Sequence, residues 1–197
     1  MSLYNVIKTT LRPTTRLLFD AKVEGTENVP PEGGLVVAAN HRSYLDPPLL
    51  GTWFPRTIHY MAKQELFKIP VLGWIIDHVH AFPVDREKAD LASVRRALKI
   101  LNAGGVVGIF PEGTRNLTGD VQAKGGAVLL AATAKVPLIP VALVRTQFGM
   151  RRFRGSHVRV RIGKPMLLQG SQRKATKAEI EQWTGQVTQA IDALAAE

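Results

Sequence analysis

Short apolar runs rich in valine and isoleucine alternate along the chain with longer stretches in which apolar residues recur every third or fourth position. The short runs are typical of buried strands, and the longer stretches are typical of amphipathic helices. This alternation predicts an α/β fold with a single mixed sheet of about seven strands covered by helices. Strands are expected at 22–24, 35–39, 57–61, 80–84, 106–110, 138–144 and 158–162, and helices at 47–53, 71–79, 87–102 and 126–134.

Two helices carry recognisable ends. The last helix is expected to begin at Thr176, with Glu179 three residues later completing a capping box. The helix 87–102 is followed by Gly104 as a stop signal. The apolar residues on one side of that helix predict a buried stripe made of Leu91, Val94, Leu98 and Leu101.

Residues 1–20 form an amphipathic N-terminal segment that is distinct from the rest of the chain. Apolar residues recur there at helical spacing with Lys8, Arg12 and Arg16 between them, and Pro13 predicts a break in the helix. Such a stripe either packs on its own domain or lies in a membrane interface, and the sequence leaves both open. Residues 21–197 are expected to form one domain.

Composition narrows the possible functions. The chain has 197 residues, of which 45% are hydrophobic, and this fits one folded domain with a substantial core. The absence of cysteine excludes thiol nucleophiles, disulfides, iron–sulfur clusters and thiolate zinc sites. A formal net charge of +10 indicates a polyanionic partner, which could be nucleic acid, anionic lipid headgroups or an acidic substrate.

No stretch of the sequence predicts a membrane-spanning helix. The longest apolar stretch, 126–144, is interrupted by Lys135, Pro137 and Pro140. The N-terminus has no apolar core followed by a small-residue cleavage site, so a secretory signal is not expected. We therefore expect a cytoplasmic protein.

A histidine and a carboxylate follow the apolar run 35–39. Asn40 and His41 come directly after it, and Asp46 comes four free positions later. A neutral imidazole oriented by a carboxylate acts as a general base, so His41 and Asp46 are the candidate catalytic residues. Two alternatives stay open: a purely structural histidine, and Asp46 as the N-cap of a helix that begins with two prolines. Ser43 is interpreted as a hydrogen bonder within the loop.

A second cluster of polar residues follows the run 106–110. Gly113 permits a tight turn, Thr114 offers a hydroxyl, and Arg115 can bind a phosphate through two parallel hydrogen bonds. The cluster therefore predicts an anion site. The alternative is a turn in which Glu112 and Arg115 only pair with each other.

Two further cations are candidate phosphate ligands. Arg86 follows the run 80–84, and Lys124 precedes two glycines at an expected helix start. No metal site is predicted, because the histidines lack the spacing of metal ligands: His59, His78, His80 and His157.

Four blocks of polar and apolar residues occur in order along the chain: Asn40-His41 with Asp46, Val84-Asp85-Arg86, Phe-Pro-Glu-Gly-Thr-Arg at 110–115, and Val-Pro-Leu-Ile-Pro-Val at 136–141. Taken together, they resemble the four ordered blocks of the glycerolipid acyltransferases, in particular the bacterial 1-acyl-glycerol-3-phosphate acyltransferases. The first and third blocks match the family pattern completely, and the resemblance covers about residues 23–164 of a domain of this size.

The resemblance implies a glycerolphosphate acyltransferase-like domain over residues 21–197. It implies transfer of a fatty acyl group from acyl-CoA or acyl carrier protein to a lysophospholipid hydroxyl, with 1-acyl-glycerol-3-phosphate as the favoured acceptor and phosphatidate as the product. His41 would take the hydroxyl proton and Asp46 would stabilise the imidazolium. The residues that would bind the acceptor headgroup are Arg86, Glu112, Gly113, Thr114, Arg115 and Lys124. No cofactor is expected beyond the thioester co-substrate, and the protein would lie peripherally on the inner face of the cell membrane.

One departure from the family pattern and one apolar segment add expectations. Pro83 stands where the family usually has an aliphatic strand residue, so the strand there is expected to be an edge strand or distorted. The segment 66–76, with Phe67 and Trp74, is the expected contact for an acyl chain or a lipid.

Other functions remain to be weighed. Within acyl transfer, the acceptor could be glycerol 3-phosphate or another lysolipid, and the carrier, chain length and oligomeric state are open. Water in place of the acceptor would make the protein a hydrolase. A nucleic-acid module is the alternative of a different class, because Arg159 and Arg161 form a basic strand face. No stacking aromatics accompany them, so nucleic acid is not expected as a partner.

Overall fold

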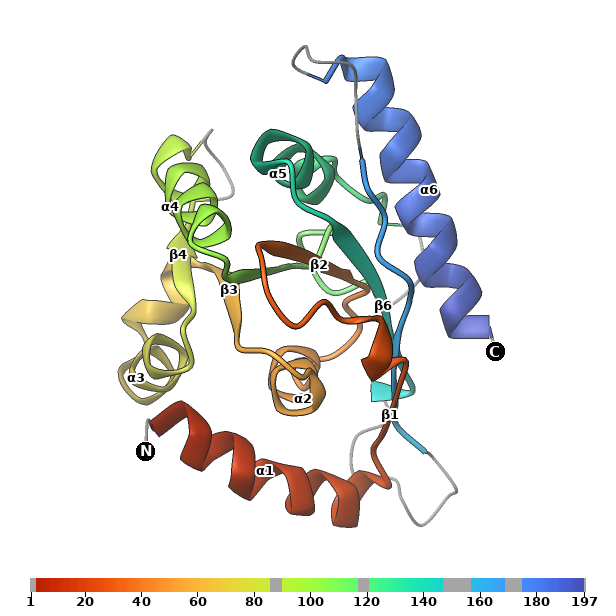
Figure 1. Cartoon of the computed structure of the whole chain (residues 1–197). Helices are drawn as coiled ribbons and strands as arrows, with labels where there is room; N and C mark the ends of the chain where they lie inside the picture. The colour runs from red at the N-terminus through yellow and green to blue at the C-terminus, as the bar shows by residue number, and fades with distance from the viewer. Residues whose placement is uncertain (1–2, 86–89, 117–120, 147–156, 169–174, 197) are drawn as a thin grey trace.

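The computed structural model describes residues 3–85, 90–116, 121–146, 157–168 and 175–196. Within them, the strands form one sheet in the order β1-β7-β6-β2-β5-β3-β4, and only the β6–β7 pair is antiparallel (Figure 1). The predicted single mixed sheet is therefore confirmed. The strands are β1 (Lys22–Glu24), β2 (Leu35–Ala39), β3 (Ile58–Lys63), β4 (Phe82–Val84), β5 (Val106–Ile109), β6 (Leu138–Val144) and β7 (Arg159–Ile162).

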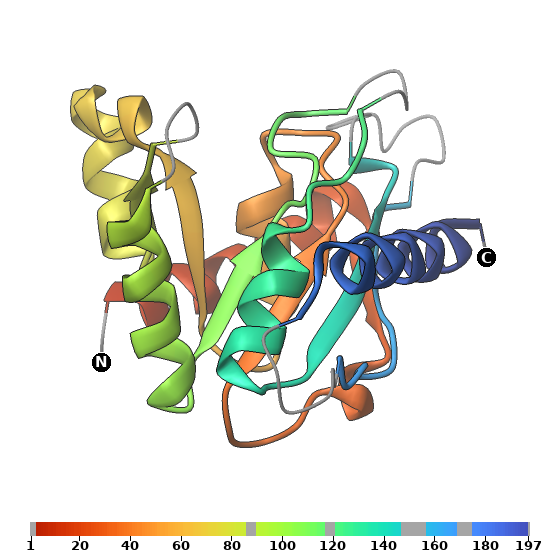
Figure 2. The same ribbon diagram turned by 90° about the horizontal axis from the view of Figure 1, so that it is seen from above.

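Helices cover both faces of the sheet. Figure 1 and Figure 2 show α1 and α2 on one face and α4, α5 and α6 on the other. The α-helices are α1 (Leu3–Phe19), α2 (Asp46–Trp53), α3 (Pro70–His78), α4 (Leu91–Asn102), α5 (Gly126–Ala134) and α6 (Lys177–Ala196); the short 3-10 helices are η1 (Thr26–Asn28) and η2 (Gln64–Lys68).

The central strand β2 explains how the two layers are held together. Leu35, Val37 and Ala39 point into the buried cluster shared with α2, whereas Val36 and Ala38 point into the cluster shared with α4, α5 and α6. All five β2 side chains are buried. A strand that is covered on both faces typically consists of an unbroken run of apolar residues, and β2 has this pattern in the sequence.

The predicted break in the N-terminal helix is wrong. The helix α1 is continuous, and Pro13 lies on its exposed side. Contacts along α2 hold the turns on both sides of the proline, which explains why the helix does not end there. Three hydrogen bonds join the two segments: Tyr4 Oη to Gly51 O (3.3 Å), Lys8 Nζ to Phe54 O (2.6 Å) and Trp53 Nε1 to Thr15 Oγ1 (3.1 Å).

The strand β4 is shorter than predicted because its first residues complete the end of α3. His80 N donates to Asp77 O, and Ala81 N donates to Ile76 O. His80 also has a left-handed backbone, with φ of 63°. The edge position expected from Pro83 is confirmed, since β4 ends the strand order and pairs with β3.

Both helix-end predictions are confirmed, whereas the predicted stripe on α4 is wrong in part. The capping box is confirmed, with Glu179 N donating to Thr176 Oγ1 (3.2 Å) and Thr176 N donating to Glu179 Oε2 (2.7 Å). Gly104 has φ of 81°, as a stop after α4 requires. The stripe predicted for α4 is wrong in its first turn, because Leu91 is 63% exposed. The buried face of α4 instead follows Ser93, Ala97 and Leu101.

Candidate active site

Parallel pairing brings the two sequence motifs to one edge of the sheet. Since β2 and β5 run parallel, Asn40 and His41 leave β2 where residues 110–115 leave β5. Asn40 ties this edge to β6: its Nδ2 donates to Leu143 O (3.0 Å), and its Oδ1 accepts from Leu143 N (2.7 Å). In parallel α/β sheets, ligands bind outside these carboxyl ends.

His41 and Asp46 form a close pair. His41 Nδ1 lies 2.9 Å from Asp46 Oδ2. The His41 side chain is 15% exposed, and its ring stacks on Phe110 with centroids 4.4 Å apart. The carboxylate and the aromatic ring both restrict rotation of the imidazole. With Nδ1 engaged by Asp46, Nε2 is the nitrogen left to accept a proton from a substrate.

Asp46 holds the loop that precedes it and does not cap the helix that follows. Its Oδ2 accepts hydrogen bonds from Arg42 N (2.6 Å) and Ser43 N (2.7 Å) as well as facing His41. No side chain caps α2, whose N-cap residue is Leu45, so the N-cap alternative for Asp46 is wrong. Ser43 Oγ accepts from Leu45 N (3.2 Å), in line with a role as a hydrogen bonder within the loop.

Glu112 and Asn116 fix the backbone of His41 from the other side. His41 N donates to Glu112 Oε2 (2.7 Å), and Asn116 N donates to His41 O (2.7 Å). Asn116 Nδ2 also donates to Glu112 Oε1 (3.3 Å). Both carboxylate oxygens of Glu112 therefore accept hydrogen bonds within the protein. Both polar groups of the His41 peptide backbone are held by the loop after β5.

Burial raises the pKa of the Glu112 carboxyl, while the hydrogen bonds from His41 N and Asn116 act against this rise. Because the folded state then binds this proton more tightly than the unfolded state, the contribution of Glu112 to stability falls as pH rises through the raised pKa. Burial of the carboxyl group thus disfavours its charged form, and the two hydrogen bonds favour it. One of these hydrogen bonds comes from His41 N and the other from Asn116 Nδ2, so the half-buried carboxyl group joins the His41 loop to the loop after β5.

We predict that Glu112→Gln lowers activity and stability together. A glutamine amide would direct its NH₂ group at one of the two present donors, so one hydrogen bond is lost and a buried donor is left unpaired. The free energy of unfolding should fall by about 1–3 kcal/mol. kcat should fall about tenfold because His41 is no longer held in place. Urea denaturation and initial rates measure both effects, and Glu27→Gln, on the exposed surface, is the control; equal losses in the two variants would contradict the role of Glu112.

The Gly113 turn lies beside two cations. Gly113 has φ of 69°, a conformation that favours glycine, and its N donates to Phe110 O (2.9 Å). A Cβ atom at Gly113 would lie 3.9 Å from Lys124 Nζ, so the ammonium group is next to the turn. Thr114 is exposed. Arg115 forms no ion pair with a carboxylate of the described residues, and Glu112 is bonded elsewhere, so the simple Glu112–Arg115 pair is absent from this part of the chain.

The structure brings most of the predicted site residues to the same place. Arg86 lies outside the described residues, immediately after Val84 and Asp85 at the end of β4. The described members that meet around the ends of β2 and β5 are His41, Asp46, Glu112, Gly113, Thr114, Arg115 and Lys124.

Three contributors to the site received no role from the sequence. Asn40 ties β2 to β6, Phe110 supports the imidazole, and Asn116 holds the His41 carbonyl group. Asn40 offers the clearest signal, because an amide side chain directly after a buried strand can reproduce the hydrogen bonds of a peptide group. Asn116 and Phe110 could be found only from their positions flanking the Gly113 turn.

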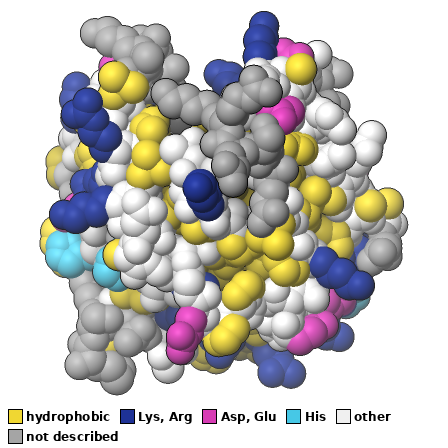
Figure 3. All heavy atoms as spheres, turned by 45° about the horizontal axis from the view of Figure 1, so that its top comes forward, with side chains coloured by type: hydrophobic (Ala, Val, Ile, Leu, Met, Phe, Trp, Pro, Cys, Tyr) yellow, Lys and Arg dark blue, Asp and Glu magenta, His cyan; other side chains and the backbone are white. Residues whose placement is uncertain are grey.

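The basic strand face that suggested nucleic acid is largely neutralised. Arg161 Nε donates to Glu24 Oε2 (3.0 Å), and Arg159 lies 3.9 Å from the same carboxylate. The Lys and Arg side chains drawn on the face in Figure 3 are spread over it and do not gather into one stripe. These contacts give the two arginines a structural role between β1 and β7.

The chain is similar to known acyltransferases in sequence and in structure. The family described as Acyltransferase matches residues 20–144. The 1-acyl-sn-glycerol-3-phosphate acyltransferase of Bacillus subtilis is 38% identical over 165 residues, covering 83% of this chain and 82% of that protein. The enzyme of the same name from Saccharomyces cerevisiae is 33% identical over 193 residues, covering 89% of this chain and 60% of that protein. The crystal structure of the 1-acyl-sn-glycerophosphate acyltransferase of Thermotoga maritima has a TM-score of 0.74 at 28% identity, covering 99% of this chain and 81% of that one.

These comparisons, together with the seven-stranded α/β sheet, show that the protein is an enzyme that transfers acyl groups. More narrowly, the chain belongs to the glycerolipid acyltransferase family. The resemblance seen in the four sequence blocks is confirmed.

Proposed function

We propose that this protein transfers a fatty acyl group from a thioester to the free hydroxyl of 1-acyl-glycerol-3-phosphate, giving phosphatidate. The acyl donor would be carried on coenzyme A or acyl carrier protein. The observation that best supports the proposal is the 2.9 Å pair of His41 Nδ1 and Asp46 Oδ2 beside the Gly113 turn. The acceptor follows the names of the relatives from Bacillus subtilis and Thermotoga maritima.

In the proposed reaction, His41 Nε2 removes the proton of the acceptor hydroxyl while its oxygen attacks the thioester carbonyl carbon. Asp46 stabilises the imidazolium that forms. The tetrahedral intermediate then collapses, the carbon–sulfur bond breaks, and the leaving thiolate takes the proton back from His41. An ester and a free thiol are the products, and His41 returns to its neutral form.

Cations at the end of β5 would bind the acceptor phosphate. Arg115 offers a planar set of N–H donors that matches phosphate geometry, and Lys124 adds a charge beside Gly113. Thr114 contributes an exposed hydroxyl. Glu112 would serve the site indirectly, because its carboxylate is bonded to the His41 backbone and to Asn116.

A thiol-release assay tests the function. Purified protein would be given acyl-CoA, or acyl carrier protein loaded with the same chain, together with 1-acyl-glycerol-3-phosphate, glycerol 3-phosphate, a lysolipid with a neutral or zwitterionic headgroup, or no acceptor. We expect thiol release that depends on 1-acyl-glycerol-3-phosphate, with phosphatidate formed in equal amount. Release at the same rate without an acceptor would instead identify a hydrolase.

We also propose that the protein works on the inner face of the cell membrane. Among the helices of the described residues, none combines the length and the apolar character needed to cross a bilayer. The helix α3 nevertheless exposes a row of large apolar side chains, the α3 patch: Ile69, Val71, Leu72, Trp74 and Ile75. Such a patch on a basic protein fits peripheral contact with anionic lipid.

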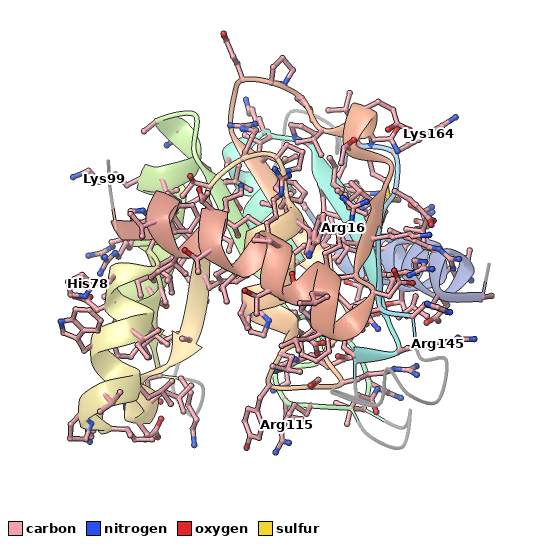
Figure 4. All side chains as sticks on the ribbon, turned by 90° about the horizontal axis from the view of Figure 1, so that it is seen from below. Arg16, His78, Lys99, Arg115, Arg145 and Lys164 are labelled. Carbon is pink, nitrogen blue, oxygen red and sulfur yellow. The ribbon has the colours of Figure 1, made fainter. Side chains whose placement is uncertain are left out.

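The helix α1 supports membrane contact on the same side of the molecule as the α3 patch. Its Lys8 and Thr15 form hydrogen bonds with Phe54 and Trp53 at the end of α2, and it leaves Val6, Leu17 and Leu18 exposed. Figure 4 shows α1 and α3 on one side of the molecule. Arg12 and Arg16 are exposed on α1, where each could add about 1 kcal/mol on an anionic leaflet.

We predict that Trp74→Ala weakens binding to vesicles that contain phosphatidylglycerol by about tenfold, because the apolar contact of a half-exposed indole is lost. Trp74 is 56% exposed, so the substitution should leave the free energy of unfolding unchanged. Leu129→Ala is the matched control, since Leu129 is an exposed apolar residue on α5, across the sheet. Co-sedimentation measures the affinities, and equal binding by both variants would reject the α3 patch as the lipid contact.

A further inference from the structure

An exposed tyrosine lies against the arginine proposed to bind phosphate. The Arg115 Cζ atom lies 3.7 Å from the centroid of the Tyr44 ring, well within the range of a cation–π contact. Tyr44 is 73% exposed, so burial in the core does not account for its position. Figure 4 places Arg115 at one end of the molecule, far from Lys164 at the other.

The backbone that carries Tyr44 is fixed by the catalytic pair. Tyr44 lies in the loop between His41 and Asp46, and two amides of that loop, Arg42 N and Ser43 N, donate to Asp46 Oδ2. Leu45 N, directly after Tyr44, donates to Ser43 Oγ. A residue on this loop therefore has a defined position relative to His41. Because the Tyr44 ring contacts Arg115, the position of the Arg115 side chain is also fixed relative to His41.

Stacking also leaves the working edge of the guanidinium available. The N–H donors of arginine lie in the plane of the group, whereas the aromatic ring covers one of its faces. The edge can thus still form two parallel hydrogen bonds to phosphate oxygens. The ring reduces the number of rotamers that Arg115 must give up when the phosphate binds.

We propose that Tyr44 is a positioning residue that holds Arg115 ready for the acceptor phosphate and couples the phosphate site to the His41 loop. This assignment rests on the proposed function, because it takes the phosphate of 1-acyl-glycerol-3-phosphate as the ligand. In this assignment the aromatic ring of Tyr44 contacts Arg115, and the tyrosine hydroxyl takes no part. Phenylalanine should therefore replace Tyr44, and aliphatic residues should not.

The test compares Tyr44→Phe, Tyr44→Leu and Tyr44→Ala in steady-state assays in which each substrate is varied in turn while the other is saturating. In the leucine and alanine variants, KM for 1-acyl-glycerol-3-phosphate should rise about three- to fivefold, the factor expected for one exposed cation–π contact. kcat and the KM for acyl-CoA should change less than about twofold, because the ring acts on the acceptor phosphate only. Tyr44→Phe should retain the wild-type KM.

A double-mutant cycle separates action through Arg115 from a general loop effect. In an Arg115→Ala background, Tyr44→Leu should cause no further rise in acceptor KM, since the guanidinium is already absent. A KM that is unchanged in Tyr44→Leu, that rises equally in Tyr44→Phe, or that rises again in the Arg115→Ala background would overturn the assignment while leaving the acyltransferase function standing. Failure of the wild-type protein to acylate 1-acyl-glycerol-3-phosphate would overturn both.

Discussion

Replacing His41 with alanine should lower kcat by about 10²- to 10⁴-fold, the range expected for loss of a general base. The reason is local: Nε2 is the ring nitrogen left to accept the hydroxyl proton, because Nδ1 lies 2.9 Å from Asp46 Oδ2. KM for either substrate should change little, since proton transfer occurs in the chemical step. Thiol release from acyl-CoA, followed with and without acceptor, measures the loss.

The fold should survive this substitution, and a second histidine offers a control. His41 is held largely through its backbone, by Glu112 and Asn116, and alanine keeps both of those hydrogen bonds. His157 also pairs with a carboxylate, that of Asp20, but at the β1–β7 edge of the sheet. His157→Ala should therefore keep wild-type kcat. Full activity in His41→Ala, with the protein folded by circular dichroism, would exclude His41 as the base.

The sheet could be predicted because its strands are buried on both faces. The run Leu35–Ala39 contains five buried residues and no polar interruption, so the hydrophobic pattern of the sequence predicts its length and position. The continuity of α1 through Pro13 was not predictable in the same way. It depends on contacts with α2, such as the one from Lys8 Nζ to Phe54 O, between residues that are far apart in the sequence.

The helix α4 shows a related limit. Periodicity alone cannot distinguish Leu91 from Leu101 within one stripe, yet Leu91 is exposed and Leu101 is buried. Asp90 is the N-cap of this helix, and its Oδ1 accepts from Ser93 N. The small residues Ser93 and Ala97 face the sheet instead, because they allow close approach of the helix.

The catalytic pair could be predicted, whereas its support could not. His41 and Asp46 are five positions apart, so a single loop can bring them together, and their chemistry is visible in the residue types. Glu112 and Asn116 reach His41 only through the parallel pairing of β2 and β5. From the sequence, Glu112 was a candidate for the acceptor headgroup. Its hydrogen bonds engage the carboxylate with the backbone of the base and with Asn116, and a contact with the headgroup stays a prediction.

Contacts in both directions hold the loop after β2 and the loop after β5 in a fixed relative position. The loop after β2 supplies the base and the Tyr44 ring, and the loop after β5 supplies Arg115 and the clamp on His41. Each loop thus positions a group that belongs to the other. A proton acceptor and a phosphate ligand held in this way would keep a constant separation, which a glycerophosphate requires because its hydroxyl and phosphate are joined by a short carbon chain.

Replacing Asp46 with asparagine should lower kcat by about 10²- to 10⁴-fold as well, although the substitution changes few heavy atoms. The amide oxygen can occupy the place of Oδ2 and still accept from Arg42 N and Ser43 N, so the loop should keep its shape. The negative charge that stabilises the imidazolium is lost, and this effect falls on kcat. The amide NH₂ would take the place of Oδ1, which is buried without a hydrogen-bond partner in the described part of the chain.

That unpaired NH₂ should also lower the free energy of unfolding by about 1–3 kcal/mol. Thermal denaturation and acceptor-dependent thiol release measure the two losses in the same preparation. Asp20→Asn is the matched control, because Asp20 is likewise an aspartate paired with a histidine but lies at the sheet edge, where an exposed side chain faces His157. Its kcat should equal that of the wild type. If Asp46→Asn also kept wild-type kcat, the carboxylate would have no part in catalysis, and the role of Asp46 would reduce to holding the loop.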